Sequence, residues 1–213
     1  MKFTIKFLLA LSLIASAGFA SMESMADKIA SLNIGMDSYI IGKELTQDQK
    51  ETAKNNNIPK AVSGTYKFKD GTTFVVASKD GDKVLVLYKS YESVDNKKIR
   101  TLFGGAMIDF GDPTAMAHDK LVYWSYDSQG KKLSEEDLQA FKDKIAGEPK
   151  GGTLAETLKK EPAANKFEPY VSVKLSCSKE IMTKEIVYDD ATAYLLMSSS
   201  KLIEEMQKQM SKK

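Results

Sequence analysis

A histidine and two aspartates in one short stretch, GDPTAMAHD, are the residues best suited to catalysis in this chain. His118 is the single histidine, with Asp119 beside it and Asp112 six residues earlier. Imidazole is the usual general acid or base near neutral pH, and functional residues are frequent on loops held by a rigid scaffold. The stretch is compatible with a small hydrolase or isomerase that uses His118 with Asp112 or Asp119. The alternative, which we favour, is a surface histidine that leads into the next strand.

Cys177, the single cysteine, is a further candidate for the catalytic nucleophile. A thiolate paired with His118 would form a nucleophile–base pair. However, Cys177 continues the alternation of Val171, Val173 and Leu175 along a predicted strand. On an apolar strand face cysteine behaves as a small apolar side chain, so we interpret Cys177 as a core residue. A chain with one cysteine can form no intramolecular disulfide.

A metal site in this sequence would depend on soft ligands. A single histidine excludes a zinc site built from histidine ligands. Met116 and His118 lie two residues apart and could offer a thioether and an imidazole to Cu(I). Most other methionines occupy apolar positions of predicted helices, where methionine is an ordinary core residue. Copper handling by Met116 and His118 is therefore a second alternative, and we predict no metal site otherwise.

Aromatic side chains on predicted strands offer a binding surface instead. The sequence contains no Gly-x-Ser-x-Gly elbow, phosphate loop, dinucleotide-binding glycine pattern, EF-hand loop or haem-attachment motif, so no cofactor is predicted. Aromatic residues could line a cleft for a small apolar molecule or contact another exported protein, although ordinary packing within the sheet is the alternative. We predict a non-enzymatic binding module whose candidate ligand-binding residues are Tyr88, Tyr91, Tyr123, Trp124 and Tyr126.

The elements that position these residues are organised around residues 62–91. Three apolar runs are separated by Asp70-Gly71 and Asp80-Gly81, which predict tight type I′ turns and a three-stranded antiparallel meander. The runs at 74–77 and 84–88 are apolar on both faces, so other elements should cover both sides of the sheet. Further strands are predicted at 121–126 and 170–177, with another possible at 186–188.

Helical spacing of apolar residues predicts helices at 22–32, 99–110, 134–146 and 202–210. Thr46 and Gln49 form a capping box that begins another short helix. Gly104 and Gly105, inside the helix at 99–110, are compatible with close approach of a backbone or ligand, but we favour tight packing on the sheet or a break in the helix. Residues 190–198 are compatible with a strand or with part of a long final helix. The predicted fold is α+β, with helices packed on an antiparallel sheet of about five to six strands.

The chain is expected to form one exported domain. Lys2 and Lys6 precede an apolar run at 7–20, and Gly18 and Ala20 stand at the −3 and −1 positions of a cleavage site, which is typical of a signal peptide. The run is shorter than a comfortable membrane span. We therefore predict a signal peptide at 1–20 and a periplasmic or secreted domain at 21–213, not membrane-spanning after cleavage, with a hinge or crossover possible at 147–169.

The charge balance of the predicted mature chain is neutral. The first 20 residues contain two lysines and no acidic residue, so 29 basic and 29 acidic residues remain. A nucleic-acid-binding protein usually carries a basic excess that neutralises phosphates. We therefore predict no nucleic-acid partner.

Overall fold

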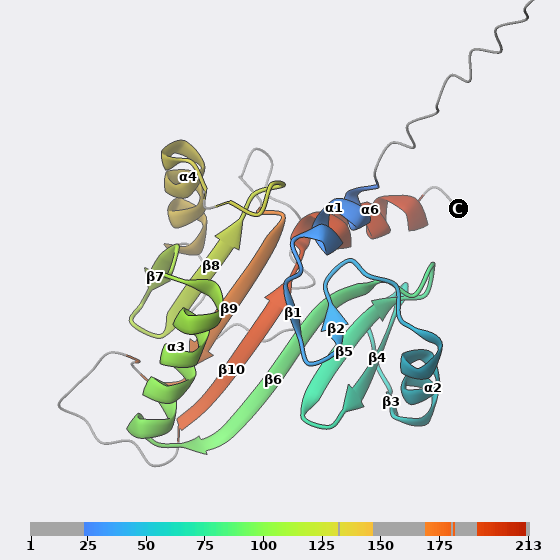
Figure 1. The fold of residues 1–213 in the computed structure, drawn as a ribbon, viewed down its shortest axis with the longest axis horizontal. Helices are drawn as coiled ribbons and strands as arrows, with labels where there is room; N and C mark the ends of the chain where they lie inside the picture. The colour runs from blue at the N-terminus through green and yellow to red at the C-terminus, as the bar shows by residue number, and fades with distance from the viewer. Residues whose placement is uncertain (1–23, 132, 147–168, 180, 182–190, 212–213) are drawn as a thin grey trace, which may run out of the picture.

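The computed structural model describes residues 24–131, 133–146, 169–179, 181 and 191–211, shown in Figure 1. Their fold is α+β, as predicted, with five helices, an antiparallel sheet of eight strands and a small two-stranded sheet. Within these residues no helix is long and apolar enough to cross a membrane. The predicted signal peptide, the predicted strand at 186–188 and nearly all of the predicted crossover at 147–169 lie outside the described residues.

The main sheet is built outward from the predicted meander. Strands β4, β5 and β6 are consecutive antiparallel neighbours, which confirms the meander, and β6 also pairs with β10 at the middle of the sheet. Across the sheet the order is β3 (Asn57–Ile58), β4 (Thr65–Asp70), β5 (Thr73–Ser78), β6 (Val84–Val94), β10 (Ala191–Ser198), β9 (Val171–Cys177), β8 (Leu121–Tyr126) and β7 (Ala115–Ala117).

The sheet has more strands than the five or six predicted. The additional strands include the two edges, β3 with two residues and β7 with three, which are too short to show an alternating pattern. Of the ambiguous residues 190–198, the described residues 191–198 form strand β10, and helix α6 (Ser200–Met210) follows it. The strand-then-helix interpretation of this part of the chain is therefore confirmed.

The two Asp-Gly turns differ from the predicted type I′ geometry. Asp70 pairs with Thr73, and Gly71 alone has a positive φ in that two-residue turn, 54°, as a type II′ turn requires. The second connection is longer, spanning residues 79–83, with positive φ at Gly81 (79°) and Asp82 (49°). The prediction of antiparallel hairpins is confirmed, whereas the predicted turn type is wrong.

Helices lie on both faces of the sheet, although on the second face α4 (Glu135–Ala146) packs at the β7–β8 end and not on the doubly apolar strands β5 and β6. Helix α3 (Asn96–Phe110) packs on the face that carries Trp124, whose ring centroid lies 6.3 Å from Phe103 and 6.0 Å from Phe110. Because side chains alternate along a strand, Tyr123 points to the opposite face. There helix α4 covers the β7–β8 end, with Phe141 5.5 Å from Tyr123.

The remaining elements pack on the α3 face or at one end of the sheet. A hairpin of β1 (Gly35–Met36) and β2 (Tyr39–Ile40) places Tyr39 5.8 Å from Phe68 of β4. Helix α2 (Gln47–Asn55) begins at the predicted capping box of Thr46 and Gln49. Helix α1 (Met25–Ser31) and α6 lie together beyond the same end of the central strands (Figure 1).

Helix α3 is continuous across its two glycines. Residues 96–110 form one helix, and a Cβ added at Gly104 or Gly105 would meet no atom within 4 Å. Ile99 and Ala106 are buried on the sheet side of α3, whereas the glycines face away from it. The predictions of tight packing or a helix break at this point are therefore wrong.

Candidate functional site

The structure places His118 in the turn between β7 and β8. His118 and Asp119 both have left-handed backbone conformations there, with φ of 55° and 54°. Asp112 lies before β7, next to Gly111, whose carbonyl accepts a hydrogen bond from Nε1 of Trp124 at 2.7 Å. Asp119 therefore adjoins His118, whereas strand β7 separates Asp112 from it. A catalytic role for His118 stays a prediction.

Cys177 ends strand β9 and is a buried, free cysteine. Its N–H donates to the carbonyl of Lys120 at 2.9 Å, which holds it beside the turn that carries His118. Burial raises the pKa of the Cys177 thiol. The thiol is therefore protonated near neutral pH, and a protonated thiol is a poor nucleophile. Since the chain has one cysteine, it has no intramolecular disulfide.

Met116 and His118, the predicted copper ligands, lie at the outer edge of the sheet. The Met116 side chain is 42% exposed, and Nε2 of His118 is buried with no hydrogen-bond partner among the described residues. In the described part of the chain, no group of three or more histidine, cysteine, aspartate or glutamate residues is placed to hold a metal ion. Copper binding by these two residues stays a prediction.

The five aromatic residues predicted to line a cleft divide between the two faces of the sheet. Trp124, Tyr91 and Tyr126 pack against the main core on the face that α3 covers. Tyr88 and Tyr123 point to the opposite face by strand alternation. The Tyr88 ring stacks on a neighbouring phenylalanine, with centroids 4.5 Å apart, and Tyr123 lies under α4. The five side chains therefore do not share one cleft, and their part in ligand binding stays a prediction.

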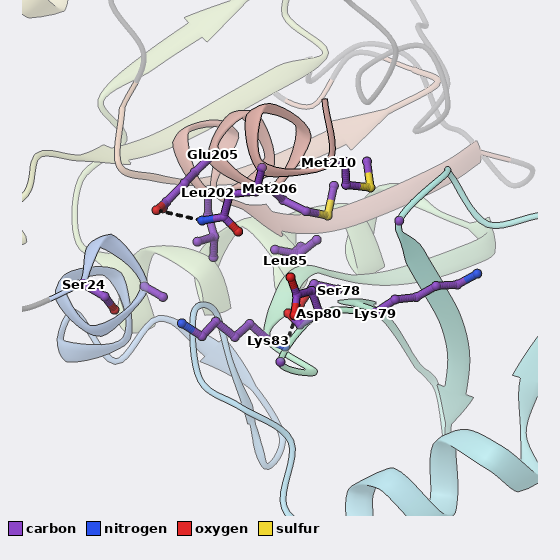
Figure 2. Close-up of a pocket in the computed structure, with 14 residues that line it drawn as sticks. Ser24, Ser78, Lys79, Asp80, Lys83, Leu85, Leu202, Glu205, Met206 and Met210 are labelled. Carbon is purple, nitrogen blue, oxygen red and sulfur yellow. Dashed lines mark hydrogen bonds between the residues drawn. The ribbon is translucent and has the colours of Figure 1, made fainter. Parts of the chain in front are cut away.

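A groove of about 530 Å³ lies at one end of β6, between α1, the β5–β6 loop and α6 (Figure 2). Its lining comes from four separate parts of the chain, which are the start of α1, Gly64, residues 78–85 and α6. None of the predicted catalytic, metal-binding or ligand-binding residues is among those that line it. Its volume is within the range of pockets that hold small ligands.

The β5–β6 loop forms a fixed wall of the groove. The Ser78 hydroxyl donates to the Asp80 carbonyl at 2.8 Å and accepts from the N–H of Lys83 at 3.0 Å. On the outer side, the Asp82 carboxylate accepts a hydrogen bond from the Tyr66 hydroxyl at 2.8 Å. The loop is thus held at both ends, and it presents Lys83 to the groove at a defined place.

Helix α6 supplies the apolar wall. Leu202, Met206 and Met210 recur every four residues on one face, and their exposed fractions rise along the helix from 5% to 8% to 36%. Ser199 caps this helix, since its hydroxyl oxygen accepts the Leu202 N–H at 3.2 Å. The Ser199 N–H donates to the Leu85 carbonyl at 3.4 Å, so the start of α6 is tied to the strand that forms the groove floor.

Met210 closes the groove at the end of α6. Its thioether packs over Gly64, in the place that a Cβ of residue 64 would occupy. Gly64 also has a φ of 76°, in the left-handed region that favours glycine. Gly64 therefore allows the methionine to lie against the backbone.

The rim of the groove is polar and carries both signs of charge. Lys83 extends from the loop toward Ser24 at the start of α1, and Glu205 stands on the α6 side, where it accepts the Gln209 amide at 3.4 Å (Figure 2). The pKa of Asp27 is lowered, chiefly because the Ser24 hydroxyl and N–H donate to its carboxylate, with a smaller effect from the Lys83 ammonium. The groove thus combines an apolar floor with polar groups at its edges.

Sequence reasoning identified none of these residues as a site. The one available signal is the apolar spacing of Leu202, Met206 and Met210, which marks a helix face but not what faces it. The rest of the lining comes from positions far apart in the chain, which meet only in the fold. Comparison of the chain with protein-family models, with curated proteins and with solved structures finds no match.

Proposed function

We propose that the chain is an exported, non-enzymatic module that binds a small apolar ligand in the groove between α1, the β5–β6 loop and α6. The observation that carries this proposal is that four apolar side chains, Leu85, Leu202, Met206 and Met210, line one concave site. Export rests on the signal-peptide features of residues 1–20.

The shape of the groove favours a small molecule as the ligand. Its volume of about 530 Å³ suits one small ligand, and Met210 over Gly64 closes one end. Methionine side chains are flexible and polarisable, so Met206 and Met210 can adapt to apolar ligands of different outline. Lys83 and Glu205 at the rim can orient a polar end of the ligand without entering the apolar floor.

The proposal predicts that a charge beside the apolar floor weakens binding. Met210→Glu places a carboxylate at the groove wall, on a side chain exposed enough to tolerate it. We expect the affinity of residues 21–213 for the neutral dye N-phenyl-1-naphthylamine to fall about tenfold, since that ratio corresponds to about 1.4 kcal/mol of lost apolar contact. Dye fluorescence measured in a titration gives the affinity.

Met116→Glu is the matched control. It makes the same substitution on a methionine of similar exposure, 42% against 36%, on edge strand β7 rather than in the groove. We expect its dye affinity to equal that of the unmodified chain. Equal losses in both variants, or no saturable dye binding at all, would contradict the proposal.

A further inference from the structure

The outer side of helix α3 combines an exposed apolar residue with two glycines. Ile108 is 86% exposed, the highest exposure of any large apolar side chain in the described residues. Lys97, Thr101, Gly104 and Gly105 precede it at intervals that place all five on one side of the helix. Leu102, Phe103 and Phe110 pack toward the core on the opposite side. This outer side therefore makes no contribution to the core.

Asp95 caps the N-terminus of α3, where its carboxylate accepts the Lys98 N–H at 2.7 Å, but the charges within the helix run against the helix dipole. Its first turn carries basic residues, Lys97 and Lys98, and no acidic one. Asp109 lies in the last turn, and Asp112 follows the C-terminal Gly111. A helix prefers acidic groups at its N-terminus and basic groups at its C-terminus, so this order weakens the isolated helix.

Contacts within the chain account for only part of this charge order. The Lys98 ammonium lies 5.9 Å from the centre of the Tyr91 ring, and this contact accounts for a lysine at that position. Lys97, Asp109 and Asp112 are exposed and take part in no ion pair among the described residues. When two copies of such a helix lie antiparallel, the basic start of each lies beside the acidic end of the other. Their charge patterns are therefore complementary.

We propose that the outer side of α3 pairs with the same side of a second copy of this chain, antiparallel, about a two-fold axis between Gly104 and Gly105. Under this symmetry Gly104 faces the partner's Gly105, and Thr101 faces the partner's Ile108. Lys97 then lies opposite the partner's Asp112. Because the glycines lack a Cβ and have open space around them, the two helices can approach closely, and each Ile108 packs over the other copy's glycines.

The interface is expected to be weak and concentration-dependent. A 15-residue helix is about 22 Å long, and one helix pair buries less than the roughly 800 Å² per partner of a standard stable complex. Its charged ends should also make it sensitive to salt, since exposed charges are screened at high ionic strength. Sedimentation velocity over a wide range of protein concentrations measures both properties.

Charge reversal with rescue tests the antiparallel arrangement. We expect Lys97→Glu and Asp112→Lys each to weaken dimerisation about fivefold, because each replaces two exposed attractive pairs with repulsive ones. The double variant that carries both Lys97→Glu and Asp112→Lys should restore dimerisation. Residues 97 and 112 of one copy lie at opposite ends of α3, about 22 Å apart, so rescue can occur only between copies. Lys97→Glu also suits the helix dipole, so loss of folding is not expected to confuse the result.

Disulfide cross-linking tests the position of the axis. Across the proposed axis, the two copies of residue 104 are offset by about 1.5 Å along the helix, whereas the two copies of residue 101 are offset by about 10 Å. Gly104→Cys should therefore cross-link readily under mild oxidation, and Thr101→Cys should not, with buried Cys177 unaffected in both. A chain that stays monomeric at all concentrations, a double variant no better than the single ones, or equal cross-linking at both positions would overturn the proposal.

Discussion

At the scale of single residues, the half-buried hydroxyls of two tyrosines link segments of the N-terminal half of the chain. The Tyr39 hydroxyl donates to Asp70 at 2.8 Å, and the Tyr66 hydroxyl donates to Asp82 at 2.8 Å. Burial is the main cause that raises the pKa of both tyrosines, and the adjacent carboxylates raise it further. Tyr39 thereby holds the β1–β2 hairpin to the sheet, and Tyr66 holds the loop that forms one wall of the groove.

These raised pKa values predict a loss of stability at alkaline pH. The unfolded chain ionises its tyrosines near the ordinary pKa of 10.0, before the folded chain does. The stabilising contribution is therefore complete below pH 10 and is lost as the pH rises above it. We expect Tyr39→Phe to lower the free energy of unfolding by about 1 to 2 kcal/mol at pH 7, because a hydrogen bond to a charged group is lost, and to flatten the alkaline decline.

Urea unfolding between pH 7 and pH 11.5 measures this dependence. Tyr194→Phe serves as the control, because the Tyr194 ring is 44% exposed. It should leave both the stability at pH 7 and the alkaline slope as they are in the unmodified chain. If the free energy of unfolding of Tyr39→Phe fell above pH 10 as steeply as that of the control, the assignment of this pH dependence to Tyr39 would be contradicted.

At the residue scale, the sequence predicted local contacts better than distant ones. The capping box of Thr46 and Gln49 is visible three residues apart and is confirmed. The bond from Tyr39 to Asp70 joins residues 31 positions apart, and no local pattern specifies that separation. The same limit applies to the groove, where Ser24, Lys83 and Met206 meet from three distant segments.

At the scale of elements, replacing a glycine of α3 with alanine is expected to raise the free energy of unfolding. Gly104 and Gly105 have helical backbone conformations, and a Cβ at either position meets no atom within 4 Å. Alanine is favoured over glycine by about 1 kcal/mol in a helix interior. We expect Gly104→Ala to raise the free energy of unfolding by about that amount, measured in urea at a protein concentration low enough to keep the chain monomeric.

Gly42→Ala is the contrasting variant. Gly42 has a φ of 86°, and a Cβ there would lie 2.6 Å from the carbonyl oxygen of Ala26. We expect the free energy of unfolding of this variant to fall by more than about 1 kcal/mol, because the alanine would strain the backbone and collide with the backbone of α1. A destabilising effect of Gly104→Ala similar to that of Gly42→Ala would show that α3 has a neighbour on its outer side within the same chain.

Elements with several turns of helix or an alternating strand were predictable, and shorter ones were not. Strand β9 alternates buried and half-buried residues over its whole length, as its sequence indicates. Edge strands β3 and β7 have two and three residues, so they depend on pairing with β4 and β8 rather than on their own pattern. The turn types also escaped prediction, because Asp70-Gly71 specifies a reversal but not which of its residues takes a positive φ.

At the scale of the whole molecule, the predicted aromatic residues and the groove lie in different places. The aromatic residues that suggested a cleft are distributed over both faces, where several of them contact α3 or α4. The groove forms instead at one end of the sheet, where α1, the β5–β6 loop and α6 meet. Binding in the groove and pairing through α3 use different parts of the surface, so each can be tested without the other.

The most direct test of ligand binding is native mass spectrometry of the protein purified from its own host, alongside Met210→Glu and Met116→Glu purified in the same way. We expect a small-molecule adduct on the unmodified chain and on Met116→Glu, and its loss or strong reduction on Met210→Glu, because only the last variant places a charge in the groove. The absence of any adduct from all three proteins, or an equal adduct on all three, would contradict the proposal that the groove is the binding site.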